Sequence, residues 1–448
     1  MTRDLAALGF ANGCVLAAGH GVLRAMGLRP ALNDLPWSLG VAYIAGAAAV
    51  GVLGSALLVA GLELTWWQIL LLCAAIAGAG CARRGELRRP ALAGGWMGAG
   101  AWIRLLPLTT AAALAVLAVD LAVQPIWADD AWAIWAIKAA SIVELGGLDP
   151  AFLSSASVFN ADYPLVVPVL ELLAMRFCGL PNELVPLQLG LPFIAFPAAL
   201  VALLRDRVRP LLLWSVVLAI ALAPSLQIQA ASAVADVTLA VFFALAGAAG
   251  WRWVERGESG LLWLTALLAA AAVGTKVEGA VFAGLLFVAL AAVARTRRRL
   301  LALAGAAAFV AASALPWELW SRRHGLGNAF SEAGGAGSVD LLDSLDRIPR
   351  AAAALSRELA DPSAWLALVA LSIGAIVLAF LRRERRAAAL FTLFVTGSSL
   401  AGLLTVYWTT PLDFDYHLAT SVRRVITAPV LFAAAMTPLL LSRGQQPR

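Results

Sequence analysis

Residues 279–299 read GAVFAGLLFVALAAVARTRRR, an uncharged apolar stretch that ends in four arginines within five residues. A membrane-spanning helix needs about 20 predominantly apolar residues, and the cytoplasmic loops beside such helices are enriched in lysine and arginine. The stretch is therefore typical of a membrane helix that ends at a cytoplasmic loop.

The same pattern recurs along all 448 residues, of which 62% are hydrophobic and only 13% are charged. A soluble globular protein carries about 25% charged residues. The composition therefore predicts an all-α polytopic membrane protein with about 11–13 transmembrane helices. The apolar ranges are 5–22, 38–62, 66–82, 104–123, 185–204, 211–223, 236–254, 260–275, 279–294, 300–317, 363–381, 387–407 and 425–441.

The formal net charge of +6 comes from short arginine-rich runs between apolar ranges. Such runs mark cytoplasmic loops, so the basic charge reflects topology and predicts no nucleic-acid partner. The acidic residues then collect on the outer side, chiefly in loops 124–184 and 318–362. The four runs are RRGELRR at 83–89, RDRVR at 205–209, RTRRR at 295–299 and RRERR at 382–386.

Two outer segments are expected to form helices that do not cross the membrane. Residues 164–180 are apolar, but a crossing there would carry the 205–209 run to the outer face. We therefore expect a short juxtamembrane or re-entrant helix begun by Pro164. The stretch DLLDSLDRIPRAAAALSRELA in the 318–362 loop is amphipathic and predicts a surface helix lying on the membrane.

The sequence predicts no metal and no cofactor. Cysteines 14, 73, 81 and 178 lack paired spacing, so neither a zinc site nor a disulfide is expected. Metal-ligand spacings and nucleotide-binding loops are also missing from the sequence.

The stretch ADDAWAIWAIKAA at 128–140 places Asp129 and Asp130 directly after an apolar range. Ionisable residues at a membrane boundary are unfavourable unless they are paired or face water, so they are functional candidates. Repulsion between adjacent carboxylates favours proton uptake by one of them, which suits a general base. Lys138 is expected near the helix face of Asp130. The alternative is a helix N-terminus with interfacial anchoring by Trp132 and Trp135.

Three further clusters of polar residues fall on the outer side. Each also has a structural interpretation, which is a capped turn for the first, an ion pair for the second and lipid-headgroup contact for the third. The functional interpretation is a cavity that holds an anionic ligand such as a lipid phosphate. The clusters are FNADYPLVV at 159–167 with Asp162 and Tyr163, GTKVEGA at 274–280 with Lys276 and Glu278, and VYWTTPLDFDYHLATSVRRV at 406–425 with His417, Arg423 and Arg424.

Six stretches in this order resemble the bacterial GT-C glycosyltransferases, multi-spanning enzymes that use polyprenyl-phosphate sugars. They are related in plan to protein O-mannosyltransferases and to the transferase that adds aminoarabinose to lipid A. The resemblance divides the chain into N-terminal helices of uncertain role at 1–100 and a GT-C-like catalytic region at 101–441. The stretches are ADDAWAIWAIKA, ADYPLVVPVLELLAMRFCG, ASAVADVTLAVFFAL, GTKVEG, LPWELW and YWTTPLDFDYHLATSVRR.

The resemblance implies an inverting transfer of a sugar to an acceptor hydroxyl. The family's base follows a span directly and maps onto Asp129, with Asp130 as its neighbour and the choice between them open. The other implied substrate contacts are Lys138, Asp162, Tyr163, Lys276, Glu278, His417, Arg423 and Arg424.

The implied setting is the bacterial inner membrane, with the active site facing the periplasm or exterior. The implied partners are a lipid-linked sugar donor, a glycan, lipid or protein acceptor, and membrane lipids. The main alternative is a polyprenyl-linked glycan flippase or another secondary transporter. The ionisable residues collect at one face instead of the bilayer midplane, which disfavours a transporter.

Overall fold

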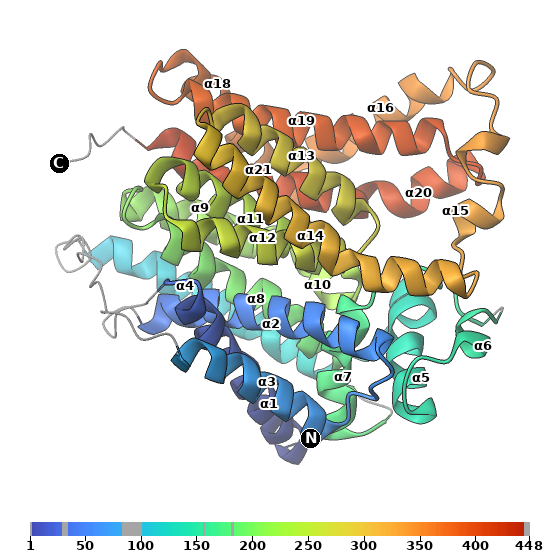
Figure 1. The fold of residues 1–448 in the computed structure, drawn as a ribbon. Coiled ribbons are helices and arrows are strands. Elements are labelled where there is room, and N and C mark those ends of the chain that lie inside the picture. The colour runs from blue at the N-terminus through green and yellow to red at the C-terminus, as the bar shows by residue number, and fades with distance from the viewer. Residues whose placement is uncertain (1, 29–34, 83–100, 156, 181–182, 443–448) are drawn as a thin grey trace.

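The computed structural model describes residues 2–28, 35–82, 101–155, 157–180 and 183–442, and all regular structure in these ranges is helical. A helix occupies each of the predicted apolar ranges (Figure 1). These helices are α1 (Thr2–Ala25), α2 (Leu35–Val59), α3 (Trp66–Ala82), α4 (Ala101–Val123), α8 (Val185–Leu204), α9 (Pro210–Leu222), α11 (Ala235–Arg256), α12 (Ser259–Val273), α13 (Glu278–Val293), α14 (Arg297–Arg323), α18 (Leu368–Leu381), α19 (Arg386–Trp408) and α21 (Thr427–Leu441).

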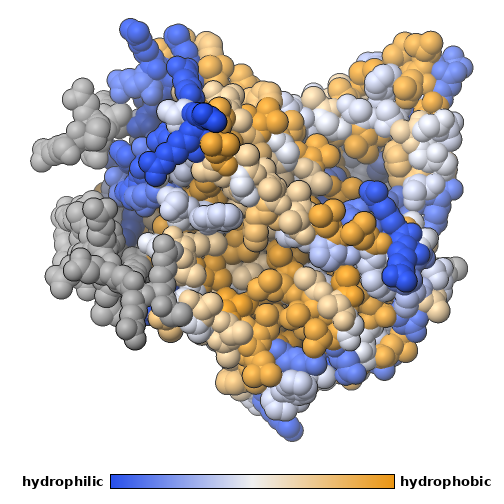
Figure 2. All heavy atoms as spheres, in the orientation of Figure 1, coloured by the Kyte–Doolittle hydropathy of each residue, from blue (hydrophilic) through white to orange (hydrophobic). Residues whose placement is uncertain are grey.

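Length and composition indicate which helices can cross a membrane. In the described ranges eight helical stretches qualify, one of them running through Phe414–Leu441, and α9 with α10 (Pro224–Ala231) forms a ninth that is bent by 51°. Four shorter apolar helices, α3, α12, α13 and α18, occupy the remaining ranges. On the face drawn in Figure 2, hydrophobic side chains cover the flank of the bundle and hydrophilic ones gather at its two ends. The chain is an all-α polytopic membrane protein.

Three of the arginine runs meet at one end of the bundle, here called the arginine end. Arg207 Nε and Arg385 Nη1 lie 3.5 and 3.9 Å from the Glu255 carboxylate, and Arg299 Nη1 donates to the Val254 carbonyl at 3.1 Å. Because all three contact the last turns of α11, the 205–209, 295–299 and 382–386 runs share a side, as the topology requires. The fourth run, at 83–89, lies outside the described residues.

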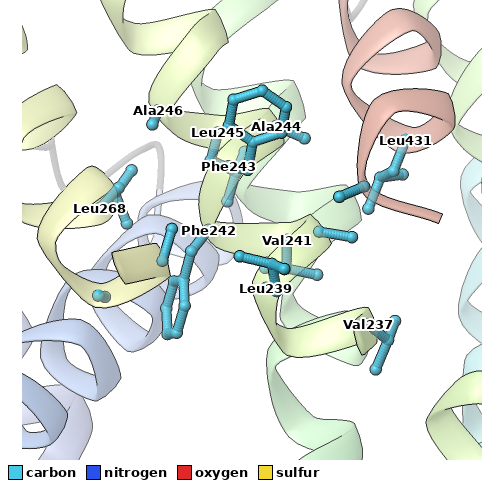
Figure 3. Close-up of a cluster of buried hydrophobic side chains, with 14 of the residues drawn as sticks. Val237, Leu239, Val241, Phe242, Phe243, Ala244, Leu245, Ala246, Leu268 and Leu431 are labelled. Carbon is cyan, nitrogen blue, oxygen red and sulfur yellow. The ribbon is translucent and has the colours of Figure 1, made fainter. Parts of the chain in front are cut away.

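Helix α11 forms the centre of the bundle and is buried along most of its length. The Phe243 ring lies 5.2 Å from that of Phe282 and 5.0 Å from that of Phe432, measured between centroids, and Figure 3 shows Phe243 among the other buried side chains of α11. A Cβ atom at Gly247 would lie 2.1 Å from the Phe432 ring, so only glycine permits this approach of α21. The packing fixes Asp236, in the first turn of α11, opposite the arginine end.

The first three helices pack closely on one another and are joined to the rest of the chain. A Cβ atom at Gly19 of α1 would lie 1.6 Å from the Ala42 carbonyl oxygen of α2, a close approach of the kind that small residues allow in membranes. Asn12 Nδ2 donates to Gln188 Oε1 of α8 at 2.7 Å, and the Tyr43 hydroxyl donates to Asn12 Oδ1 at 2.9 Å. The predicted boundary at residue 100 ends a range outside the described residues and stays a prediction.

The end opposite the arginine end, here called the loop end, carries the shorter helices. In Figure 1, α5 and α7 cross the direction of the long helices there. The 124–184 loop contributes η2 (Ala131–Ala136, a π-helix), α5 (Ile137–Leu145), α6 (Pro150–Leu153) and α7 (Val166–Cys178). The segments before α18 and α21 contribute α15 (Ala329–Glu332), η3 (Ala336–Ser338, a 3-10 helix), α16 (Arg347–Ala360), α17 (Pro362–Trp365) and α20 (Phe414–Val425).

Both helices predicted outside the spans form, but each packs on protein. Residues Val166–Met175 of α7 are all buried, against α1, α2, α5 and α8. The buried side of α16, formed by Ala351, Ala354 and Leu355, faces α19 and α20. Neighbouring helices therefore cover much of the apolar face of this amphipathic helix, and its contact with the membrane stays a prediction. Helix α14 also extends beyond the predicted span, to Arg323.

Candidate functional site

The two adjacent aspartates lie at the start of the helix that leads into η2, and they have different environments. Asp130 contacts Arg424 Nη1 through its carboxylate and makes no capping hydrogen bond, although it precedes η2. Asp129 is exposed, and its side chain has no hydrogen-bond or ion-pair partner in the part of the chain that the structure describes. The capping alternative therefore does not account for Asp130.

A narrow recess beside this pair is lined by charged and apolar side chains. Lys276 Nζ lies 2.9 Å from Asp236 Oδ1 and 3.1 Å from Glu278 Oε1. Arg424 lines the same recess, so that two cations from distant segments meet there. The complete lining is Asp236, Leu239, Lys276, Glu278, Phe282, Arg424, Val425 and Ala428.

The ionised side chains of the recess are stabilised by neighbouring opposite charges rather than by contact with solvent. Burial lowers the pKa of Lys276, but the carboxylates of Asp236 and Glu278 outweigh that effect and hold it above its ordinary value. Lys276 therefore stays protonated. Arg424 Nε and Glu278 Oε2 are buried without hydrogen-bond partners among the described groups. Unsatisfied buried polar atoms destabilise a fold by about 1–3 kcal/mol each. A ligand that forms hydrogen bonds to these two atoms would therefore recover that free energy on binding.

The two adjacent arginines diverge. Arg423 Nε lies 2.7 Å from Glu358 and its Nη2 lies 3.3 Å from Asp361, both outside the recess. Arg424 alone of this pair lines the recess and contacts Asp130. His417 does not line it either, because its Nδ1 lies 2.9 Å from the Thr410 hydroxyl and its ring packs 5.1 Å from Tyr407.

Lys138 is placed differently from the sequence expectation. Its side chain is fully buried, does not line the recess, and donates from Nζ to the carbonyls of Asn160 at 2.9 Å and Tyr163 at 3.1 Å. Burial lowers its pKa to about 7. The expected regular helix from Asp130 onward contains a π-helical stretch instead, which changes the i, i+4 spacing on which the shared face depended. The structure thus gives Lys138 two carbonyl partners and no contact with the recess.

Asp162 and Tyr163 are also not among the residues that line the recess. The Asp162 carboxylate accepts a hydrogen bond from Asn328 Nδ2. The Tyr163 ring packs 5.5 Å from that of Trp135, measured between centroids. Of the predicted contacts, the structure therefore brings together Asp130, Lys276, Glu278 and Arg424.

Asp236 joins the site although it was absent from the predicted residues. It is 5% exposed and supplies the nearest carboxylate to Lys276. The sequence carried a signal, an aspartate in the first turn of an apolar range within ASAVADVTLAVFFAL. An ionisable residue in a membrane helix is a functional candidate by default.

Glu171 of α7 gives a prediction that concerns stability. It is fully buried, neither carboxylate oxygen has a hydrogen-bond partner among the described groups, and burial raises its pKa well above its ordinary value, opposed by Lys138. A folded-state pKa raised in this way makes the folded state bind the proton more strongly, so stability falls as pH rises above about 4.3, the ordinary value for glutamate. Glu171→Gln should therefore raise the melting temperature in detergent at pH 7.5, and the gain should shrink toward pH 4.5. An equal or lower melting temperature at pH 7.5 would contradict this account.

Comparisons with models of protein families, with curated proteins and with solved structures find no match for this chain. Within the described residues, no three His, Cys, Asp or Glu side chains are grouped so as to hold a metal ion. The fold and the recess define a polytopic membrane protein with two cations and three carboxylates gathered opposite its arginine end.

Proposed function

We propose that this protein is an integral membrane glycosyltransferase of the GT-C type. It moves a sugar from a polyprenyl-phosphate donor to an acceptor hydroxyl with inversion. The observation that carries the proposal is that Asp129 is exposed and has no partner among the described residues, while the carboxylate of its neighbour Asp130 contacts a cation of the recess. A free base beside a recess that contains two cations, Lys276 and Arg424, suits a transfer away from a lipid phosphate.

The chemistry assigns one role to each group. Asp129 accepts the proton of the acceptor hydroxyl, and the hydroxyl oxygen attacks the anomeric carbon of the donor sugar. The bond from that carbon to the phosphate oxygen breaks, and polyprenyl phosphate leaves with the bonding electrons. Lys276 and Arg424 stabilise its negative charge. Asp129 is assigned as the base because its carboxylate is exposed, whereas the carboxylate of Asp130 is engaged by Arg424.

The arrangement of the arginine runs supports the proposed setting of the reaction. Since cytoplasmic loops carry the excess of arginine, the arginine end faces the cytoplasm and the recess faces the periplasm or exterior of a bacterial inner membrane. The donor tail lies among membrane lipids, and the acceptor is a glycan, a lipid or a protein. The transfer uses no nucleotide, because the donor is already activated by its phosphate bond.

The test uses the purified full chain in liposomes with a polyprenyl-phosphate sugar labelled in the sugar. A glycosyltransferase converts the donor to free polyprenyl phosphate and labelled acceptor when a hydroxyl acceptor is supplied. A transporter leaves the donor intact and moves it to the other leaflet. Intact, relocated donor with no cleavage would overturn the proposal and favour the transporter.

A further inference from the structure

A short turn in the first outer loop joins three parts of the loop end. The Phe159 amide donates to the Ala133 carbonyl of η2 at 3.2 Å, and Lys138 Nζ donates to the carbonyls of Asn160 and Tyr163. Asn160 has φ +49°, a left-handed conformation that asparagine adopts more readily than most residues. Residues 158–163, here called the latch, are thus tied firmly to the helix that begins at Asp129.

The other side of the latch holds a segment that follows α14. The Asp162 amide donates to the Gly327 carbonyl at 3.3 Å, and the Ala329 amide donates to Asn160 Oδ1 at 3.0 Å. Asn328 Nδ2 donates to the Asp162 carboxylate. The indole of Trp317 adds a hydrogen bond to the Asp162 carbonyl at 2.7 Å. Residues 326–333, here called the strap, are therefore bound to the latch by backbone and side-chain hydrogen bonds.

Apolar support of the strap is limited to partly buried residues, among them Leu326, which packs against the core. Its helix, α15, has no buried residue. Glycines with positive φ stand at both of its ends, Gly325 at +66° on one side and Gly334 and Gly335 at +97° and +63° on the other. Such positions turn the chain sharply and suit hinges. Hydrogen bonds to the latch, rather than apolar packing of α15, therefore decide where the strap lies.

We propose that Asn160 and Asp162 are positioning residues, which latch the strap to the helix that carries Asp129, and that Asp162 does not itself contact substrate. The effect of the latch on sugar transfer rests on the proposed function. The hydrogen bonds that form the latch do not depend on that function. Asp162 Oδ1 lacks a hydrogen-bond partner among the described groups, so a direct role for this carboxylate in binding substrate is the competing interpretation.

Asn328 permits a test that separates the two interpretations. Its Oδ1 accepts from the Ser331 amide and caps α15, while its Nδ2 donates to Asp162. Asn328→Asp keeps the cap, because aspartate caps as well as asparagine, but it removes the donor and sets two carboxylates against each other. Adding Asp162→Asn restores a donor facing a carboxylate, with the two groups exchanged. Asp162→Asn alone keeps an acceptor for Asn328 and should weaken the latch only slightly.

The measurement is amide hydrogen exchange of the purified full chain, followed by peptide over the strap and over residues 131–137 and 158–163. Asn328→Asp should speed exchange of the strap about tenfold or more and should also speed exchange of the latch and η2 peptides. The double variant should return both to near the wild-type rate, and transfer rates should follow the same order.

Three results would overturn the proposal. Unchanged exchange in Asn328→Asp would show that no latch exists, whatever the activity. Faster exchange confined to the strap would show that the latch does not reach η2. The third result is a loss of transfer in Asp162→Asn alone that adding Asn328→Asp does not restore, which would show that Asp162 contacts substrate. If the wild type transfers no sugar, the proposed function fails while the exchange experiment still decides the latch.

Discussion

The Asp129→Asn variant is expected to transfer sugar about a hundredfold to ten-thousandfold more slowly than the wild type, the range that one positioned general base contributes. Its amide has the shape of the carboxylate but cannot accept the acceptor proton. Because Asp129 does not line the recess, binding of polyprenyl phosphate should be unchanged. The measurement is the single-turnover transfer rate at saturating donor, with donor affinity measured separately.

Two matched variants make this result specific. Asp149→Asn lies in the same outer loop, where Asp149 caps α6, and asparagine caps equally well, so transfer should stay at the wild-type rate. Asp130→Asn removes the charge facing Arg424 and should chiefly alter the affinity for the donor phosphate. A larger loss of rate in Asp130→Asn than in Asp129→Asn would reverse the assignment of the base.

The second large effect concerns the ion pairs of the recess. Lys276→Met leaves the carboxylates of Asp236 and Glu278 without their cation, and removing one member of a buried pair destabilises a protein by about 3–5 kcal/mol. The variant should therefore unfold in detergent at a much lower temperature than the wild type. Adding Asp236→Asn removes the closest uncompensated charge, so part of the stability should return. Donor binding should be weakened in both variants, because each lacks one of the two cations of the recess.

The control for this experiment is Arg322→Met. Arg322 pairs with Glu318 at 3.4 Å, but its side chain is 80% exposed, and exposed ion pairs contribute about 0–1 kcal/mol. Its melting temperature should stay close to that of the wild type. If Lys276→Met proved as stable as Arg322→Met, the Lys276 ion pairs would not support the fold, and only their role in binding would remain.

The sequence predicted those features that the membrane requires of each segment separately, such as the helical structure of an apolar range. Each apolar range became a helix, and α11 shows why, since nearly every one of its positions is buried whichever way it faces. The spacing of glycines in α1 and α2 did not predict that Gly19 would pack against the Ala42 carbonyl. The π-helical stretch at Ala131–Ala136 was also invisible, because its apolar residues suit an α-helix equally well.

Length, apolarity and arginine placement by themselves determined that this chain is a polytopic membrane protein and which loops share the arginine end. These properties depend on the thickness and polarity of the bilayer, which act on each segment separately. Tertiary structure alone decided which charges meet. Arg424, and not Arg423, faces Asp130 across 294 residues of sequence, and Asp236 reaches Lys276 across 40. The physical reason is that such meetings depend on how each helix is rotated and packed against the others, which spacing within one segment does not specify.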